Sequence, residues 1–437
     1  MKSKLILCVG FFLITLNQCS ITIGNSDLNV VPAETDRITS LLPAPEVYHN
    51  FWDAVKHFDF DYINRHEVTE VERTFVRGLQ AMIAGDFEEA EKLYWDIFTD
   101  SRDSLLQKQC AIVLQALLNY AYKWDELVEL DRQLPGGLDE ENSVAFARAF
   151  QSVPPERITF PDKPVVLPTD LSISGVPIIE VTVNGRKQKF WIDTGAEMTV
   201  LASDVARKCG ITEFRRDIAT LGTATEIMVE SWPGVIQKLK IGELTIEHHP
   251  AIVIDKKDLE VRLFKLIKLI KIDGILGWNA IMQLQLEIDY QNGLTTIQKP
   301  VTNPSSRPNF HFAGVPFVNL SDTSGTPFHF FLDTGANRTG LYEPALSKVD
   351  TLESIRKTAL VGGAGGTQKI EHIQLPHQSF LLGRHQLNFK NIGIQGDGEH
   401  YFFHYDGVIG SDIARFGTLI LDFKNGRCEL KFSEEKP

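Results

Sequence analysis

Four blocks of sequence occur twice, in the same order, in the C-terminal part of this 437-residue chain. Each pair shares apolar residues and glycines at matching positions. The pairs are residues 175–177 with 314–316, 190–196 with 330–336, 273–277 with 406–410, and 288–293 with 421–426. Because an ordered series of matches is typical of a duplicated structural unit, we predict two similar lobes within one chain.

The duplicated region has the pattern of an all-β fold. Short apolar runs alternate with turn residues, as in residues 178–183, which precede the hairpin-type turn Asn184-Gly185. Proline-rich stretches at 151–169 and 301–308 interrupt the chain, and proline disfavours both helices and central strands. The first stretch precedes the β region, and the second separates two predicted lobes, residues 170–300 and 309–437.

The preceding residues 45–150 have the apolar spacing of helices, so we predict an all-α region there. Gly78 and Ala90 would allow close helix packing, and Gly85 would end a helix, in a segment that resembles a tetratricopeptide helix-turn-helix. A weaker copy covers residues 111–134, displaced by 124 − 87 = 37 residues. The resemblance implies a docking module for a protein partner.

The chain begins with basic residues and a short apolar run. Lys2 and Lys4 precede residues 5–16, which have the length of a signal-peptide core and are too short to span a bilayer. We therefore expect residues 1–19 to be a signal peptide, residues 20–44 to be a polar tether, and the protein to be exported.

Cys19 ends the sequence Leu16-Asn17-Gln18-Cys19, which resembles a bacterial lipoprotein cleavage site. Two interpretations stay open. Either Cys19 is lipidated and provides a lipid anchor, or the signal peptide is removed without lipidation. The corresponding locations are the periplasm or outer membrane as a lipoprotein, or the secreted fraction.

The composition excludes some classes of partner. A net charge of −13 and a pI near 5.4 argue against nucleic acid, which rewards clustered Lys and Arg. Beyond Cys19 the cysteines are Cys110, Cys209 and Cys428, too few for a disulfide framework. Buried free thiols are expected, with a single Cys209–Cys428 bridge as the alternative.

An Asp-Thr-Gly-Ala sequence follows an apolar run in each half, beginning at Asp193 and Asp333. Each is followed by an apolar-apolar-Gly segment, at 275–277 and 408–410. The arrangement resembles the retropepsin-like aspartic peptidases over residues 170–434, in a tandem, single-chain form of bacterial type. The resemblance implies a multidomain protein, with an all-α helical repeat region followed by an all-β bilobal aspartic peptidase fold.

The resemblance assigns the catalytic role to the two aspartates. Amide hydrolysis without a metal needs one group to deprotonate water and another to protonate the carbonyl, and two adjoining carboxyl groups sharing one proton do both. Such a pair titrates with one raised pKa. By the same resemblance, supporting roles fall on Thr194, Gly195, Thr334 and Gly335. No metal or cofactor is implied, and a monomer suffices for catalysis.

The residues that follow the glycines of the two Asp-Thr-Gly sequences indicate the pH at which such an enzyme would be active. In pepsin-like enzymes a hydroxyl at this position can hydrogen-bond the ionised Asp and lower its pKa, and Ala196 and Ala336 lack it. We expect activity at mildly acidic pH.

The resemblance also implies a β-hairpin lid. Glycine-containing stretches begin 28 residues after each aspartate (221 − 193 = 28 and 361 − 333 = 28). The predicted lid residues are Leu221, Gly222 and Thr223 in the first lobe, and Val361, Gly362, Gly363, Ala364, Gly365 and Gly366 in the second. Two ordinary glycine turns are the alternative interpretation.

Other candidate sites are weaker. His248-His249 lacks the spacing of a metal site, so surface or core histidines are expected. Residues 262–271, with lysines among Leu and Ile, fit either a membrane-surface helix or an element packed in the first lobe. Asp273 and Asp406 are expected to make structural hydrogen bonds.

The expected partner of this chain is a peptide or protein substrate. Three functions remain open. The first is an aspartic endopeptidase. The second is a catalytically silent peptide-binding protein that retains the fold, and the third is a scaffold that acts through its helical region. Intact Asp-Thr-Gly in both halves favours the enzyme.

Overall fold

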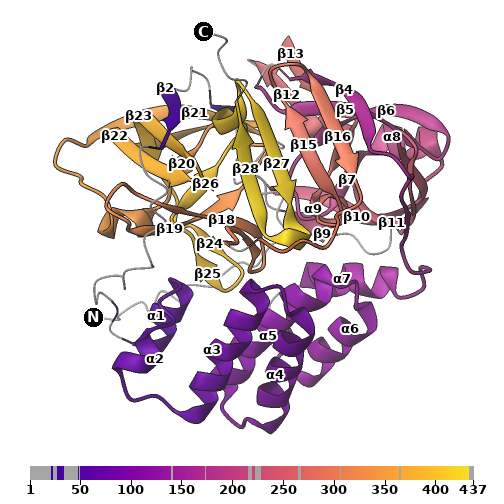
Figure 1. Ribbon diagram of the computed structural model, residues 1–437. Helices are drawn as coiled ribbons and strands as arrows, with labels where there is room; N and C mark the ends of the chain where they lie inside the picture. Colours follow the sequence, from indigo (N-terminus) through magenta and orange to yellow (C-terminus); the bar gives the residue numbers. More distant parts are fainter. Residues whose placement is uncertain are drawn as a thin grey trace, which may run out of the picture.

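The computed structural model describes residues 21–22, 27–33, 48, 50–138, 141–172, 174–214, 219–221, 228–263, 267–305, 307–363 and 366–432. Cys19 and the rest of the predicted signal peptide lie outside these residues. A helical N-terminal region is followed by a β-rich C-terminal region, which confirms the predicted order of the two classes of structure. The helices lie beneath two β lobes that stand side by side (Figure 1).

The helical region consists of consecutive, mostly antiparallel helices. They are α1 (Phe51–Lys56), α2 (Tyr62–Arg65), α3 (Glu70–Ile83), α4 (Phe87–Asp100), α5 (Ser104–Tyr120), α6 (Trp124–Gln133) and α7 (Glu141–Phe150). A capping box of Thr69 and Glu72 begins α3, and Asp86 caps α4 after Gly85, whose φ is +83°. None of the described helices is long and apolar enough to cross a membrane.

Helices α3 and α4 pack closely because a glycine faces an aromatic ring. A Cβ atom placed on Gly78 would lie 2.7 Å from the ring of Tyr94. The hydroxyl of Tyr94 donates a hydrogen bond to the carbonyl oxygen of Phe75, 2.9 Å away, so the buried ring has one fixed position. The absence of a side chain at residue 78 therefore sets the spacing of this helix pair.

The two lobes have matching strands. In the first lobe they are β4 (Val165–Leu171), β5 (Pro177–Val183), β6 (Arg186–Ile192), β7 (Thr199–Ala202), β8 (Thr212–Glu213), β9 (Ala219–Leu221), β10 (Val229–Ile241), β11 (Leu244–Ile254) and β14 (Gly274–Leu276), with helix α8 (Ser203–Cys209) after β7. In the second they are β17 (Phe310–Phe312), β18 (Pro316–Ser321), β19 (Pro327–Leu332), β20 (Gly340–Leu341), β21 (Ile355–Gly363), β22 (Gly366–Leu382), β23 (His385–Ile394), β24 (Glu399–His400), β25 (Phe403–His404) and β26 (Gly407–Ile409).

The pairing of strands in the first lobe is repeated in the second lobe, as the sequence blocks are. Strand β14 runs parallel to β6 and antiparallel to β7, and β26 runs parallel to β19 and antiparallel to β20. Likewise, β7 lies parallel to β11, and β20 lies parallel to β23. The duplication in the sequence is therefore a duplication of topology.

A separate set of strands joins the lobes. These strands are β15 (Gln285–Asp289), β16 (Leu294–Gln298), β27 (Thr418–Asp422) and β28 (Arg427–Lys431). Strand β15 of the first half pairs antiparallel with β27 of the second, with Glu287 opposite Ile420 (Figure 1). Backbone hydrogen bonds thus cross from one half of the chain to the other.

Two segments expected to be connections contain strands. The predicted tether, residues 20–44, includes β1 (Ile21–Thr22) and β2 (Asp27–Pro32), which pair with β21 and β23 of the second lobe. The proline-rich stretch 151–169 includes β3 (Arg157–Thr159) and the start of β4. Pro168 takes the last register position opposite β16, and a strand pairing tolerates proline at its end.

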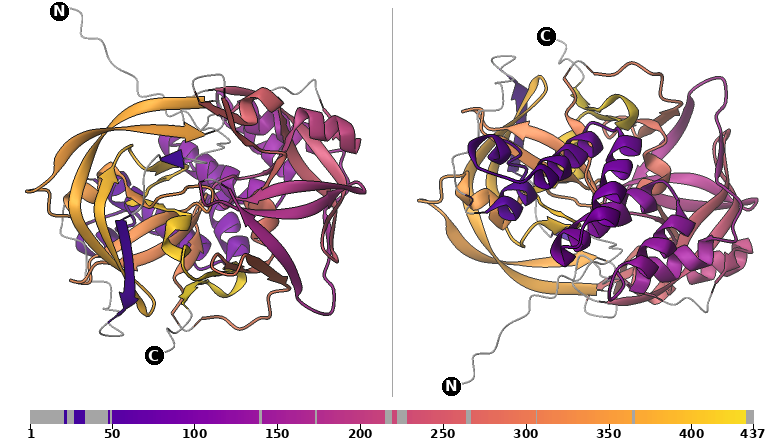
Figure 2. Two further views of the ribbon diagram at one scale, coloured as in Figure 1. Left: turned by 90° about the horizontal axis from the view of Figure 1, so that it is seen from above. Right: turned by 90° about the horizontal axis from the view of Figure 1, so that it is seen from below.

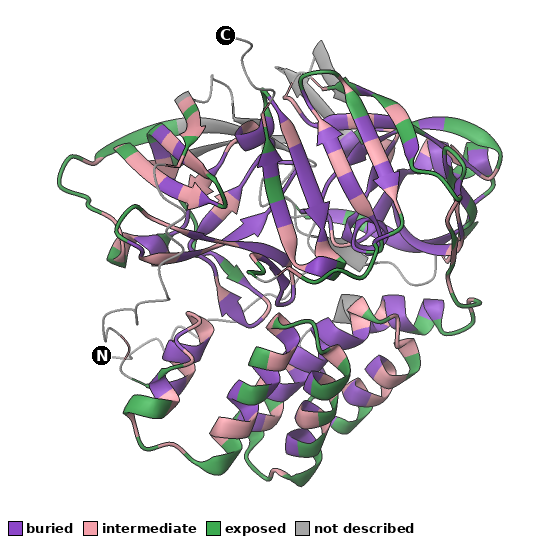
Figure 3. Ribbon diagram, viewed as in Figure 1, coloured by how far each residue is buried: buried purple, intermediate pink, exposed green. Residues whose placement is uncertain are grey.

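The helical region packs against both lobes. The ring of Phe58 stacks on His329 at 4.1 Å and on Phe403 at 4.3 Å, both in the second lobe. Helix α7 lies against β9 and β10 of the first lobe. Seen from below, the helices extend across both lobes (Figure 2), and their buried residues face inward (Figure 3). The helical region therefore makes apolar contacts with both lobes.

Replacement of Gly78 tests the packing of α3 on α4. We expect Gly78→Ala to lower the free energy of unfolding by about 1–3 kcal/mol, because the added methyl group overlaps the fixed Tyr94 ring. Urea denaturation followed by circular dichroism measures the change. Lys92→Ala, at an exposed site on α4, should leave the midpoint unchanged, and equal stability of both variants would contradict the packing argument.

Candidate active site

The two Asp-Thr-Gly sequences form equivalent loops at the centre of the β region. Asp193 follows β6, and Asp333 follows β19; their side chains are 1% and 0% exposed. The backbone N–H of Asp193 donates to the carbonyl oxygen of Leu276 at 3.1 Å, and that of Asp333 donates to Ile409 at 2.9 Å. The apolar-apolar-Gly strands β14 and β26 therefore fix where each aspartate leaves its strand.

Thr194 and Thr334 join the two loops by reciprocal hydrogen bonds. Each threonine N–H donates to the hydroxyl oxygen of the other, at 3.0 Å in both directions. Each hydroxyl in turn donates across the interface, Thr194 to Leu332 at 2.7 Å and Thr334 to Ile192 at 2.9 Å. All four bonds cross between the lobes, so the loops hold each other in place.

The two carboxyl groups interact with each other. Burial raises the pKa of Asp333 well above its ordinary value, and the charge of Asp193 and a hydrogen bond with its carboxylate raise it further. Backbone N–H groups of Ala336 and Gly335, which donate to Oδ1 of Asp333 at 3.0 and 2.8 Å, act in the opposite direction and are outweighed. The two carboxyl groups therefore titrate as a coupled pair in which the pKa of Asp333 is raised.

Gly335 is required by the approach of the opposite loop. A Cβ atom at this position would lie 2.5 Å from the carboxyl group of Asp193. Gly195 donates its N–H to Oδ1 of Asp193 at 2.9 Å, as Gly335 does to Asp333. The glycines of both motifs thus bring a backbone donor close to each carboxylate.

Two further pairs of residues support the loops and were not found from the sequence. Asn279 accepts hydrogen bonds at Oδ1 from the N–H and hydroxyl of Thr199, at 2.9 and 3.0 Å. In the second lobe Asp412 accepts the same two bonds from Thr339, at 3.0 and 2.7 Å. The signal was available, because 339 − 199 = 140 equals the offset of the aspartates and 412 − 279 = 133 equals that of Gly277 and Gly410.

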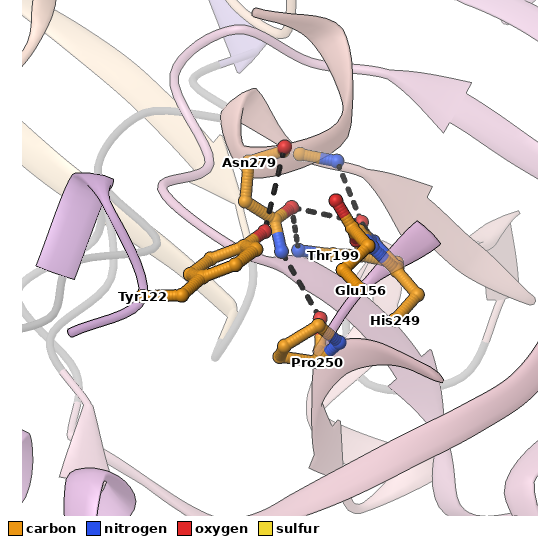
Figure 4. Close-up of polar contacts among 7 residues, drawn as sticks. Tyr122, Glu156, Thr199, His249, Pro250 and Asn279 are labelled. Carbon is orange, nitrogen blue, oxygen red and sulfur yellow. Dashed lines mark hydrogen bonds and ion pairs between the residues drawn. The ribbon is translucent and has the colours of Figure 1, made fainter. Parts of the chain in front are cut away.

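His249 belongs to the same network in the first lobe and is a satisfied core histidine. Its Nε2 lies 2.7 Å from the hydroxyl of Thr199, and its Nδ1 contacts the carboxylate of Glu156 (Figure 4). Asn279 Nδ2 donates to the carbonyl oxygen of Pro250 at 3.0 Å and completes the network. Within the described residues no group of three or more His, Cys, Asp or Glu side chains could hold a metal ion.

Asp406 makes the structural bonds expected of it. It accepts hydrogen bonds from the N–H of His329 and from Lys348 Nζ, both at 2.8 Å. Burial by itself would raise the pKa of Asp406, but the ion pair with Lys348 and the bond with His329 outweigh it and hold the pKa at about 2. This cluster anchors the strand that leads to Asp333.

The predicted lid residues that the structure describes lie in antiparallel strand pairs. In the second lobe β21 and β22 pair up to Gly363 opposite Gly366, while Ala364 and Gly365 lie outside the described residues. In the first lobe Leu221 pairs with Val229, while Gly222 and Thr223 also lie outside the described residues.

Residues 262–271 fall largely in the hairpin of β12 (Glu260–Leu263) and β13 (Ile267–Lys271), and β12 lies against β22.

Glu197, four residues beyond Asp193, is a titratable group that the sequence did not single out. Tyr401 of the second lobe donates a hydrogen bond to it at 2.6 Å. Burial raises the pKa of Glu197 to about 7, and the Tyr401 bond, which lowers it, compensates only in part. The duplicate position carries Asn337, so comparison of the halves gives no signal for this acid.

Comparison with known proteins agrees with this geometry. Residues 179–280 match the family described as Aspartyl protease. The first lobe thus has an aspartyl protease fold. The UBA domain-containing protein Mud1 of Schizosaccharomyces pombe is 28% identical over 165 residues, which cover 34% of this chain and 45% of Mud1. The chain therefore matches less than half of that relative's length.

One solved structure is also similar in part. It is described as a retropepsin-like aspartic protease from Rickettsia conorii, with 18% identity and a TM-score of 0.21. The alignment covers 33% of this chain and 93% of that one.

The pKa of Glu197 predicts how stability depends on pH. The unfolded chain loses this proton near pH 4.5, whereas the folded protein keeps it to about pH 7, so stability should fall as pH rises through this window. We expect Glu197→Gln to remove this part of the pH dependence of the free energy of unfolding, which amounts to up to about 3 kcal/mol. Urea midpoints at pH 5 and pH 8 measure it.

The control for this measurement is Glu353→Gln, at an exposed turn. It should follow the pH dependence of the unaltered chain. A Glu197→Gln variant with that same dependence would show that Glu197 ionises normally in the folded protein.

Proposed function

We propose that this protein is an aspartic endopeptidase in which Asp193 and Asp333 activate a water molecule. The observation that carries the proposal is the interaction of the two buried carboxyl groups, with the pKa of Asp333 raised by burial and by Asp193. The family match over residues 179–280 supports the same reaction class. Both aspartates come from one chain, so we propose that a monomer is sufficient.

We assign Asp333 as the protonated member of the pair because its pKa is raised, and Asp193 as the ionised member. Ionised Asp193 takes a proton from water as the water oxygen attacks the carbonyl carbon of the peptide bond, while Asp333 donates its proton to the carbonyl oxygen. Asp193 then protonates the amide nitrogen as the C–N bond breaks, and a hydroxyl of the intermediate returns a proton to Asp333. Thr194, Gly195, Thr334 and Gly335 hold the carboxyl groups in register without reacting.

An extended peptide suits the lid. Strand β21 already pairs along one edge with residues of its own chain, Ile21 opposite Gly362 and Thr22 opposite Val361. Strand addition of this kind provides affinity through backbone hydrogen bonds that do not depend on side chains. A peptide substrate would pair with this edge of β21 in place of β1.

The remaining sequence predictions complete the proposal. The paired helices α3–α4 and α5–α6 would serve as a tetratricopeptide-like module that docks a protein partner. The N-terminal signal would export the protein to the periplasm or outer membrane as a lipoprotein through Cys19, or into the medium. The peptidase would be a tandem retropepsin-like enzyme of bacterial type.

Removal of either carboxylate tests the proposed catalysis. We expect Asp193→Asn and Asp333→Asn each to lower the rate of cleavage of a mixed peptide library by at least about a hundredfold, because neither variant can share a proton between two carboxyl groups. Asp162→Asn, at an exposed position, is the matched control. A statine-type inhibitor should block the unaltered protein.

Cleavage that is equal in all four proteins would end the peptidase proposal. Peptide binding without cleavage by the unaltered chain would instead support a catalytically silent peptide-binding protein with the same fold.

A hydroxyl beside the dyad should shift the working pH. We expect the unaltered protein to be most active at mildly acidic pH, and Ala336→Ser to move the alkaline limb of the pH–rate profile to lower pH. Ala336 is buried next to Asp333, so a serine hydroxyl there would stabilise the ionised carboxylate. An optimum below about pH 3 in the unaltered protein would contradict the prediction.

A further inference from the structure

A cavity of about 570 Å³ lies where the helical region meets the second lobe and the connection between the lobes. The turn between α3 and α4 forms one wall, at residues 83–85. Residues 299–300, 304–305, 308 and 310–312 of the inter-lobe connection form another, and the short helix η4 (Phe423–Asn425) closes a third side. Neither catalytic aspartate lines it. Its volume is in the range of about 300–1,000 Å³ that is usual for small-ligand sites.

The body of the cavity is aromatic. Its walls include Phe87, Tyr120, Phe312 and Phe423, and the Tyr120 ring packs at 4.5 Å from Phe87 and 4.8 Å from Phe312. Phe87, Tyr120 and Phe423 are only half-buried, so apolar surface remains uncovered. Burial of a ligand's apolar side chain against these rings would be favourable.

The charged lining of the cavity is exclusively basic. Lys299 and Lys424 line it, are exposed, and make no ion pair or hydrogen bond with the described residues. None of the described lining residues is Asp or Glu, although the chain as a whole has a net charge of −13. The cavity therefore favours a ligand that carries a negative charge next to an apolar group.

His311 adds a hydrogen-bond acceptor to this lining. Its Nδ1 lies 3.0 Å from the carbonyl oxygen of Ile83, which accepts only, so Nδ1 carries the proton. Burial, the largest influence, lowers the pKa of His311 and keeps the ring neutral, although the carbonyl groups of Ile83 and Pro308 act the other way. Nε2 is then an acceptor, and it is buried with no hydrogen-bond partner among the described residues.

We propose that this cavity binds the carboxyl-terminal end of a peptide whose last residue is apolar. Such a residue has the three groups that the lining complements: an apolar side chain for the aromatic rings, a carboxylate for Lys299 and Lys424, and a backbone N–H for His311 Nε2. A fatty acid has no such donor, and an inorganic anion has no apolar body. The site is separate from the proposed peptidase centre, and binding to it requires no cleavage.

The direct test is calorimetric titration of the full chain carrying Asp193→Asn with acetyl-Leu-Phe, a dipeptide with a free carboxyl terminus. We expect saturable binding with a Kd on the order of 100 μM, given the affinity that ligands of this size reach. The C-terminal amide of the same dipeptide should bind at least tenfold more weakly. Equal affinity for acid and amide, or no saturable binding up to 5 mM, roughly fifty times that Kd, would overturn the proposal.

Exposed lysines offer variants that leave the fold intact. Lys299→Glu combined with Lys424→Glu should weaken acetyl-Leu-Phe binding at least tenfold, whereas Lys108→Glu combined with Lys240→Glu, also exposed and remote from the cavity lining, should not change it. Matching affinities in these two variants would place the ligand elsewhere.

Two further titrations separate the peptide from other occupants. Pro304→Trp, at an exposed edge of the lining, should block binding by filling the cavity. Dodecanoate, which lacks the backbone N–H, should bind more weakly than acetyl-Leu-Phe. Tighter dodecanoate binding that Pro304→Trp abolishes would overturn the peptide proposal in favour of a fatty acid.

Discussion

The reciprocal hydrogen bonds between Thr194 and Thr334 are the interaction on which the rest of the β region depends. Two buried carboxyl groups repel when both are ionised, so only a rigid frame keeps them together. The threonines supply that frame, because each one satisfies the backbone of the opposite loop and is itself buried. Because this frame holds Asp193 of the first lobe beside Asp333 of the second, the pKa of Asp333 depends on both lobes.

Each of the two loops is supported from outside by the N-terminal part of the chain, and the two supports differ. In the first lobe Glu156, from the proline-rich stretch, contacts His249, which in turn contacts Thr199 on β7, next to β14. In the second lobe Phe58, from the helical region, stacks on His329, the partner of Asp406. The duplicated core is thus symmetric, while its surroundings are not.

This asymmetry gives the helical region a structural consequence beyond any role in docking. Its removal would uncover the rings of Phe317 and Phe403, which pack with helical side chains in one apolar cluster. It would also remove one wall of the cavity at the inter-lobe connection. The helices and the lobes are therefore better regarded as one packed unit than as separate modules.

The two halves could be compared within the sequence, and this comparison identified the residues that occur twice. Asp193 with Asp333 and Thr194 with Thr334 were identified in this way, and Thr199 with Thr339 could have been, because they share the same offset. Glu197 could not, since its counterpart is Asn337 and its pKa depends on burial and on Tyr401, 204 residues away. Strands β1 and β2 were also missed, because the strands that they pair with, β21 and β23, lie more than 300 residues further along the chain.

The sequence by itself determined the order of the helical and β regions, the duplication, and the residues that the two lobes bring to their common centre. These follow from local spacing and from repetition, which need no knowledge of distant contacts. Only the tertiary structure decided which groups are buried together, and burial is the largest cause of the shifted pKa values of Asp333, Glu197 and His311. A desolvated group responds to the neighbours that the fold brings to it, and those neighbours are far away along the chain.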